Sequence, residues 1–155
     1  MALRVHLRRQ AGPLEVDPVG VKRFARAVLR GEGLADGALT LVLTDNAAVR
    51  ELNARFREKD RTTDVLSFPL HEEDEGGLYL GDVVISTERA REQAPRFHND
   101  EESELARLIA HGILHLLGYD HHRPAAGRAM KAAERRALAA FTPGTLVRGT
   151  QGGLA

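Results

Sequence analysis

Residues 105–121 read LARLIAHGILHLLGYDH, and they combine an apolar helical pattern with three histidines. Asp100 precedes this segment as a suitable N-cap, and Gly118 can adopt the left-handed conformation that ends a helix. We therefore predict a central helix over residues 101–117. Its second half has little polar surface, so we expect it to be buried in the core.

The three histidines have the spacing of a metal centre. On a helix, His111 and His115 lie on one face, with their Cβ atoms about 5–6 Å apart. His121 follows a chain reversal at Gly118 and can approach the same point from another direction. Three neutral imidazoles would leave a fourth tetrahedral position open, as in catalytic zinc sites. We predict His111, His115 and His121 as ligands of one divalent metal ion; zinc suits this set, and so do nickel and copper.

The spacing also matches the zinc-protease pattern H-E-x-x-H-x-x-G-x-x-H, with one difference. Gly112 stands where the protease carries the glutamate that acts as general base. A glycine cannot remove a proton. A zinc peptidase is therefore the weaker interpretation, and it would require a carboxylate from elsewhere in the chain.

The remaining segments predict one α+β domain over residues 1–155, with about four strands in a mixed sheet and about five helices. Alternating or apolar runs predict strands at 3–9, 38–44, 64–70 and 78–86, the third ending at Pro69, with a solvated hairpin loop at 71–77. Capping residues and helical spacing predict helices from Pro18, from Thr44 or Asp45, over 87–96, over 101–117, and from Pro124 to Phe141. We expect residues 142–155, which are rich in glycine, to form a flexible tail.

Composition narrows the class of protein. The 155 residues include no cysteine, 43% hydrophobic residues and 28% charged residues, with a net charge of zero. This composition excludes disulfides and thiolate metal sites and is ordinary for a globular protein. We find neither a signal peptide nor a membrane-spanning run and expect a cytoplasmic protein. Because the net charge is zero, a nucleic-acid partner would need a local basic patch.

Three motifs resemble the YbeY family of endoribonucleases, which are bacterial rRNA maturation factors. The segment HGILHLLGYDH (111–121) is similar to the family's histidine motif, including the glycine at its second position. LNARFREKDRTTDVLSFPL (52–70) resembles the family stretch in which an arginine precedes a T-(N/D)-V-L-S-F-P strand. LGDVVIS (80–86) resembles a third family strand, and the three motifs occur in the family's order.

The resemblance implies a zinc-dependent, single-strand-specific endoribonuclease that acts in 16S rRNA 3′-end maturation and ribosome quality control. It implies His111, His115 and His121 as metal ligands, with His111 and Arg57 in catalysis. His122 could compete with His121, but the family motif ends at His121. Single-stranded rRNA and the small ribosomal subunit are the expected partners. The alternative is a non-catalytic ribosome-assembly factor with structural zinc.

Chemical roles follow for a few further residues. Arg57 and Lys59 are expected to bind substrate phosphates, since arginine can do so through paired hydrogen bonds. Asp120 is expected to orient one of the metal ligands. Glu104 is a weak candidate for the general base. The attacking group, either water or the ribose 2′-hydroxyl, is left open by the sequence.

Overall fold

The computed structural model describes residues 2–57, 65–74, 77–120 and 123–148. The chain folds as one α+β domain, as expected. The described elements are, in order, β1 (Leu3–Arg9), α1 (Pro18–Gly31), β2 (Gly37–Thr44), α2 (Asn46–Arg57), β3 (Val65–Asp74), β4 (Gly77–Ser86), α3 (Thr87–Gln93), the 3-10 turn η1 (Ala94–Phe97), α4 (Glu101–Leu116) and α5 (Pro124–Leu138).

The four strands form one mixed sheet in the order β1-β2-β4-β3. The pairs β1/β2 and β2/β4 are parallel, and β3 pairs with β4 in the antiparallel direction. β3 is thus an edge strand, the position in a sheet that tolerates a proline such as Pro69 best.

The predicted end of the third strand at Pro69 is wrong. β3 continues to Asp74, and its register against β4 shifts between Pro69 and Glu72. His71 lies within the shift and has a positive φ of 51°. The strand is therefore irregular next to the proline, and its pairing with β4 resumes at Glu72. The expected solvated loop at 71–77 therefore consists largely of paired strand.

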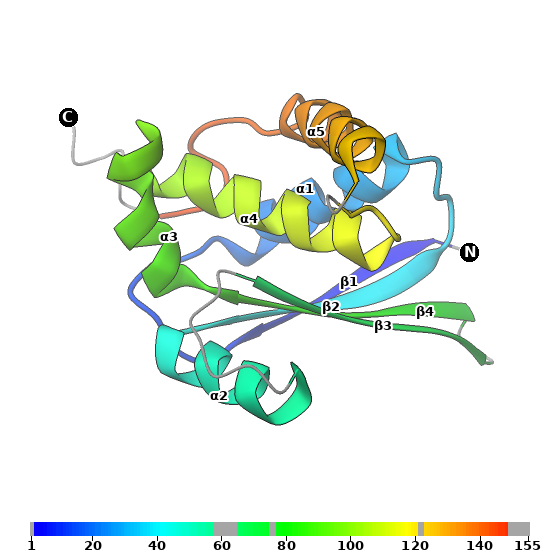
Figure 1. Ribbon diagram of the computed structural model, residues 1–155, viewed down its shortest axis with the longest axis horizontal. Coiled ribbons are helices and arrows are strands. Elements are labelled where there is room, and N and C mark those ends of the chain that lie inside the picture. Colours follow the sequence, from blue (N-terminus) through cyan, green and yellow to red (C-terminus); the bar gives the residue numbers. More distant parts are fainter. Residues whose placement is uncertain (1, 58–64, 75–76, 121–122, 149–155) are drawn as a thin grey trace.

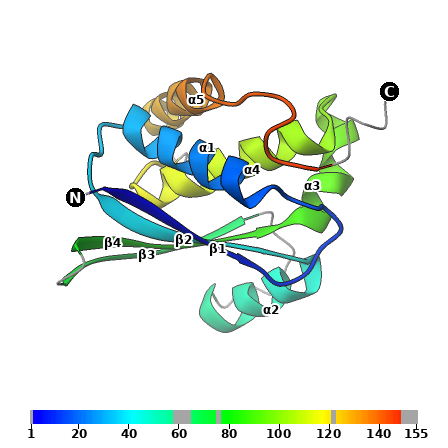
Figure 2. The ribbon, with the colours of Figure 1, turned by 180° about the vertical axis from the view of Figure 1, so that it is seen from behind.

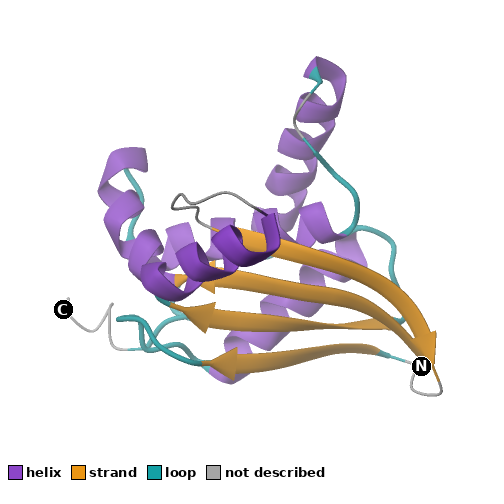
Figure 3. Ribbon diagram, turned by 60° about the horizontal axis from the view of Figure 1, so that its bottom comes forward, coloured by secondary structure: helices purple, strands orange, loops and turns teal. Residues whose placement is uncertain are grey.

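The sheet separates the helices into two layers. Figures 1 and 2 show α1, α4 and α5 on one face of the sheet, and Figure 3 shows α2 on the other. α4 packs directly against β3 and β4, and its apolar side chains lie in the main core. This burial confirms the prediction of a central buried helix, which begins after the predicted cap: Asp100 accepts a hydrogen bond from the Ser103 amide at 2.7 Å.

Residues 142–148 correct the prediction of a flexible tail. Val147 pairs with Val16 in an isolated β-bridge, and Leu146 is fully buried. The carboxylate of Glu102, itself only 5% exposed, accepts hydrogen bonds from the amides of Gly144, Leu146 and Val147 at 2.7, 3.0 and 3.1 Å. Apolar burial and a buried acceptor hold this segment against α4; residues 149–155 lie outside the described part of the chain.

Candidate metal centre

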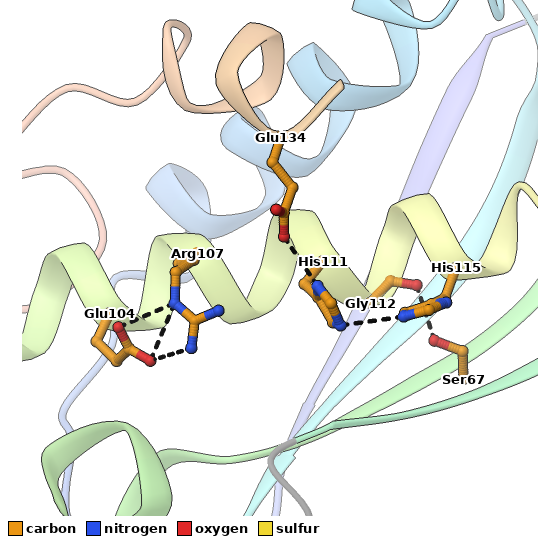
Figure 4. A network of polar contacts seen from close by, with 7 residues as sticks. All are labelled: Ser67, Glu104, Arg107, His111, Gly112, His115 and Glu134. Carbon is orange, nitrogen blue, oxygen red and sulfur yellow. Dashed lines mark hydrogen bonds and ion pairs between the residues drawn. The ribbon is translucent and has the colours of Figure 1, made fainter. Parts of the chain in front are cut away.

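His111 and His115 lie one turn apart on α4, and their rings converge, as Figure 4 shows. Their Nε2 atoms are 3.0 Å apart, and the ring centroids are separated by 4.5 Å. Both side chains are partly exposed although most of α4 is buried. The helix therefore brings two imidazole nitrogens to one point at the edge of the core, as the spacing predicts.

Glu134 of α5 holds the outer nitrogen of His111. Its Oε2 atom lies 2.8 Å from His111 Nδ1. The pKa of the Glu134 carboxyl is lowered, chiefly by this hydrogen bond and further by the charges of His111, Arg107 and His115, against an opposing contribution from burial. An ionised carboxylate can only accept, so Nδ1 of His111 is the donor in this contact, and in the neutral imidazole Nε2 is then the acceptor nitrogen, facing His115.

The two described histidines fit a metal ion. Two nitrogens bound at about 2.0–2.1 Å to one tetrahedral ion would lie about 3.3 Å apart, close to the observed separation. A carboxylate on the opposite ring nitrogen is the usual support of a metal-binding histidine. Among the described residues, no three His, Cys, Asp or Glu side chains gather as a metal site, and the predicted third ligand, His121, lies outside them together with His122.

The chain segment that leads to His121 is held in place by a contact far away in sequence. Gly118 has a φ of +103° and ends α4, as its position predicts. The hydroxyl of Tyr119 then donates to Glu32 Oε1 at 2.6 Å, and Arg136 contacts both groups. Asp120 is exposed and directly precedes His121, so its orienting role stays a prediction.

Gly112 faces the sheet and is tightly enclosed. A Cβ atom at this position would lie 2.4 Å from Val83 Cγ1 and 2.8 Å from Val65 Cγ2. The Gly112 carbonyl also accepts a hydrogen bond from Ser67 Oγ at 2.8 Å, which joins α4 to β3. The position that carries the general base in zinc proteases is here a packing contact, so it has no space for a glutamate.

Glu104, the weak candidate for the general base, is engaged elsewhere. It is fully buried, and its Oε2 atom lies 2.5 Å from Arg107 Nη2. Its other oxygen accepts from the amide group of Asn99 at 3.3 Å. Both carboxylate oxygens of Glu104 are thus engaged by Asn99 and Arg107 and not by the histidine pair.

Most of the predicted phosphate-binding segment lies outside the described residues. Arg57 is the last residue of α2, but its side chain and all of Lys59 lie outside the described structure. Their predicted phosphate contacts therefore remain predictions. Next to Arg57, Phe56 is 60% exposed and meets Phe68 edge to face, with ring centroids 5.9 Å apart.

Sequence reasoning missed Glu134. It stands 23 positions after His111 in a helix with several other charged residues, and no motif marks it. Only the packing of α5 on α4 brings it to the histidine.

Comparison with known proteins identifies the family. The sequence model described as "Endoribonuclease YbeY" matches residues 14–142, which is most of the chain. The chain belongs to the YbeY endoribonuclease family. YbeY proteins are hydrolases that act on RNA, so membership of the family implies an RNA substrate.

Individual relatives agree with this assignment. The chain is 48% identical to "Endoribonuclease YbeY" of Aquifex aeolicus over 103 residues, covering 66% of this chain and 69% of that protein. It is 42% identical to the protein of the same name from Carboxydothermus hydrogenoformans, covering 83% of this chain and 90% of the relative. It spans only 40% of a longer YbeY protein from Myxococcus xanthus, at 48% identity over 74% of this chain.

A solved structure shares the fold. The solution structure of TM1509 from Thermotoga maritima aligns with a TM-score of 0.56 at 28% identity, covering 88% of this chain and 89% of that one.

Within the described residues, no helix is long and apolar enough to cross a membrane.

Proposed function

We propose that this chain is a zinc-dependent, single-strand-specific endoribonuclease that acts in 16S rRNA 3′-end maturation and ribosome quality control. Family membership supports cleavage of RNA. The observation that carries metal dependence is the arrangement Glu134–His111–His115, in which a carboxylate sets the tautomer of one imidazole and two Nε2 atoms converge at 3.0 Å.

His111, His115 and His121 would hold the ion in this proposal. When bound, a divalent ion supplies Lewis-acid chemistry toward a phosphoryl oxygen and activates water near neutral pH. The protein's own contribution at the described residues is to fix His111 through Glu134. It also seats α4, the helix that carries both histidines, against the sheet through Gly112.

Arg57 is assigned to the substrate phosphate. Its guanidinium group would bind two phosphate oxygens and offset the charge that develops during cleavage. Lys59 would contribute a second positive charge that contacts the phosphates of the same RNA strand. Asp120 would orient His121 or His115 from outside the ligand set. Phe56, the residue before Arg57 on α2, is exposed.

The deciding experiment is cleavage of a labelled single-stranded rRNA fragment with bound metal quantified in the same preparations. Wild type is compared with His111→Ala and Arg57→Ala. The wild type should cut, His111→Ala should lose both metal and activity, and Arg57→Ala should keep metal while losing about 2–4 kcal/mol of transition-state stabilisation. Loss of metal in Arg57→Ala would contradict its assignment to phosphate binding.

Equal cleavage by all three preparations would indicate a contaminating nuclease and would favour the non-catalytic assembly factor. The cleaved ends identify the attacking group. A 2′,3′-cyclic phosphate would assign the first step to the ribose 2′-hydroxyl, whereas its absence from the earliest products would favour water. A substrate with a 2′-deoxy sugar at the cleavage position provides the matched control, because only the first route requires that hydroxyl.

A further inference from the structure

A groove of about 500 Å³ runs between α4 and α5 and includes His111 in its wall. Its volume is within the range of ordinary ligand pockets. The charged and titratable residues that line it are Arg107, His111, Arg123, Arg128, Lys131 and Glu134. The groove therefore begins at the candidate metal centre and continues along α5.

The carboxylates in and behind this groove already have partners. Glu134 bonds to His111 Nδ1 at 2.8 Å, and Glu104 bonds to Arg107 at 2.5 Å. Arg107 also lies over the ring of Phe97, with its Cζ atom 5.2 Å from the centroid. Neither carboxylate is thus available to balance the cations farther along α5.

The positive charge that these carboxylates do not balance lies on Arg123, Arg128 and Lys131. All three are exposed, and no ion pair joins any of them to a carboxylate within the described structure. Arg128 and Lys131 are three residues apart on α5 and share a face, where like charges destabilise a helix slightly. The arrangement favours an anionic ligand that lies along the helix and relieves this repulsion.

We propose that the α4–α5 groove binds the phosphodiester backbone of an RNA strand next to the position of cleavage. This inference rests on the proposed function, and it adds a subsite apart from Arg57. α2, which ends at Arg57, lies on the opposite face of the sheet from α5 (Figures 1 and 3). Phosphate contacts from arginine and lysine give affinity without reading sequence, so the groove would extend the footprint of the strand and leave base preference unchanged.

Binding of a fluorescently labelled single-stranded RNA at several salt concentrations tests the groove. The variant is Arg128→Ala/Lys131→Ala; Arg123 is left intact because it adjoins the segment that contains His121. The matched control is Arg23→Ala/Arg30→Ala, which removes two exposed arginines from α1, neither of which lines the groove. RNA integrity is checked on a gel after each titration, and metal content and circular dichroism are compared for all three proteins.

Each phosphate contact on a single strand contributes about 0.7 to the slope of log K against log salt. The groove variant should bind more weakly, with a slope shallower by about 1.4, while the control keeps the wild-type slope. An unchanged slope in the groove variant, equal losses in both variants, or absence of RNA binding by the wild type would each overturn the subsite.

Cleavage of the same RNA by the wild type separates this proposal from the proposed function. If the wild type cuts but the groove variant keeps its slope, the subsite is wrong and the nuclease assignment stands. If the wild type binds with the predicted salt dependence but never cuts, the groove stands as an RNA-binding surface and the catalytic assignment fails.

Discussion

Glu134 Oε2 lies 2.8 Å from His111 Nδ1 across the interface between α5 and α4. The bond fixes which nitrogen of His111 carries the proton, and so it leaves Nε2 directed toward His115. One helix thus supplies the two imidazoles, and another supplies the carboxylate that sets the tautomer of His111. The stability of the α4–α5 interface and the affinity of the candidate metal centre are consequently linked.

Replacement of Glu134 should weaken metal binding. We expect Glu134→Ala to lower zinc affinity by about 10–100-fold, because His111 loses the acceptor that orients its ring and raises its basicity. Glu134→Gln keeps an acceptor oxygen but no charge, so its loss should be smaller. Competition with a chromogenic chelator measures both affinities.

The matched control is Glu101→Gln, which alters a carboxylate of α4 that is paired with Arg91 away from the histidines. It should bind zinc as the wild type does. Wild-type affinity in Glu134→Ala would show that the contact does not support the metal centre.

Gly112→Ala tests why the histidine motif contains a glycine. The new Cβ would lie within 3 Å of Val83 and Val65, so α4 must shift away from the sheet or the valines must move. We expect a loss of about 1–3 kcal/mol in the free energy of unfolding, measured in urea. Gly31→Ala is the control, because no atom lies within 4 Å of its added methyl group, and it should be neutral or slightly stabilising. Equal stabilities for the two variants would refute the packing explanation.

The same position explains how much of the site could be read from the sequence. The helical period places His111 and His115 together without knowledge of the fold, and Gly118 marks the end of the helix. Which face of α4 meets the sheet, and therefore why residue 112 must be glycine, depends on Val65 and Val83 in strands far away in sequence. Glu134 escaped prediction for the same reason, since no local pattern shows which side of α5 packs on α4.

The secondary structure could likewise be predicted from the sequence in most places but not in all. Caps, periodicity and turns predict most elements because they act within a few residues of one another. The prediction from sequence was wrong at β3, where pairing with β4 extends the strand past Pro69. It was also wrong at residues 142–148, where the glycine-rich composition indicated a flexible tail although Leu146 and Val147 are buried. At β3, pairing of residues 72–74 with 77–79 in the same hairpin outweighs the proline. At residues 142–148, contacts with distant Val16 and Glu102 outweigh the glycines.

Glu102→Ala should release the segment 142–148 from α4. Without the carboxylate, the amides of Gly144, Leu146 and Val147 lose their acceptor; those of Leu146 and Val147 are buried. We expect a loss of about 1–3 kcal/mol in the free energy of unfolding. Hydrogen exchange at these three amides should also become faster.

A neighbouring carboxylate provides the control for this prediction. Glu101 pairs with Arg91, whose side chain is 51% exposed, so Glu101→Ala should cost at most about 1 kcal/mol. Unchanged exchange at residues 144–147 in Glu102→Ala would mean that burial of Leu146 and Val147 alone holds the segment.

The hydrogen bonds of Tyr79 on β4 predict that the stability of the fold depends on pH. Its hydroxyl bonds to Asp82 and lies 2.6 Å from Thr40 Oγ1. Burial raises its pKa above the usual 10.0, as does the hydrogen bond to Asp82, while the bond with Thr40 opposes the rise. Because the folded pKa exceeds the unfolded one, the associated stability is fully present below pH 10 and is lost as the pH rises through the folded pKa.

Tyr79→Phe should remove this alkaline loss. The difference in free energy of unfolding between wild type and variant should be constant below pH 9 and shrink as the pH rises beyond about 10. Tyr119, whose pKa is also raised, is present in both proteins and cancels in the difference. Urea unfolding at a series of pH values provides the measurement. A difference that stays constant through the alkaline range would show that the Tyr79 hydroxyl titrates alike in the folded and unfolded chain, and that its bond to Asp82 contributes no linkage.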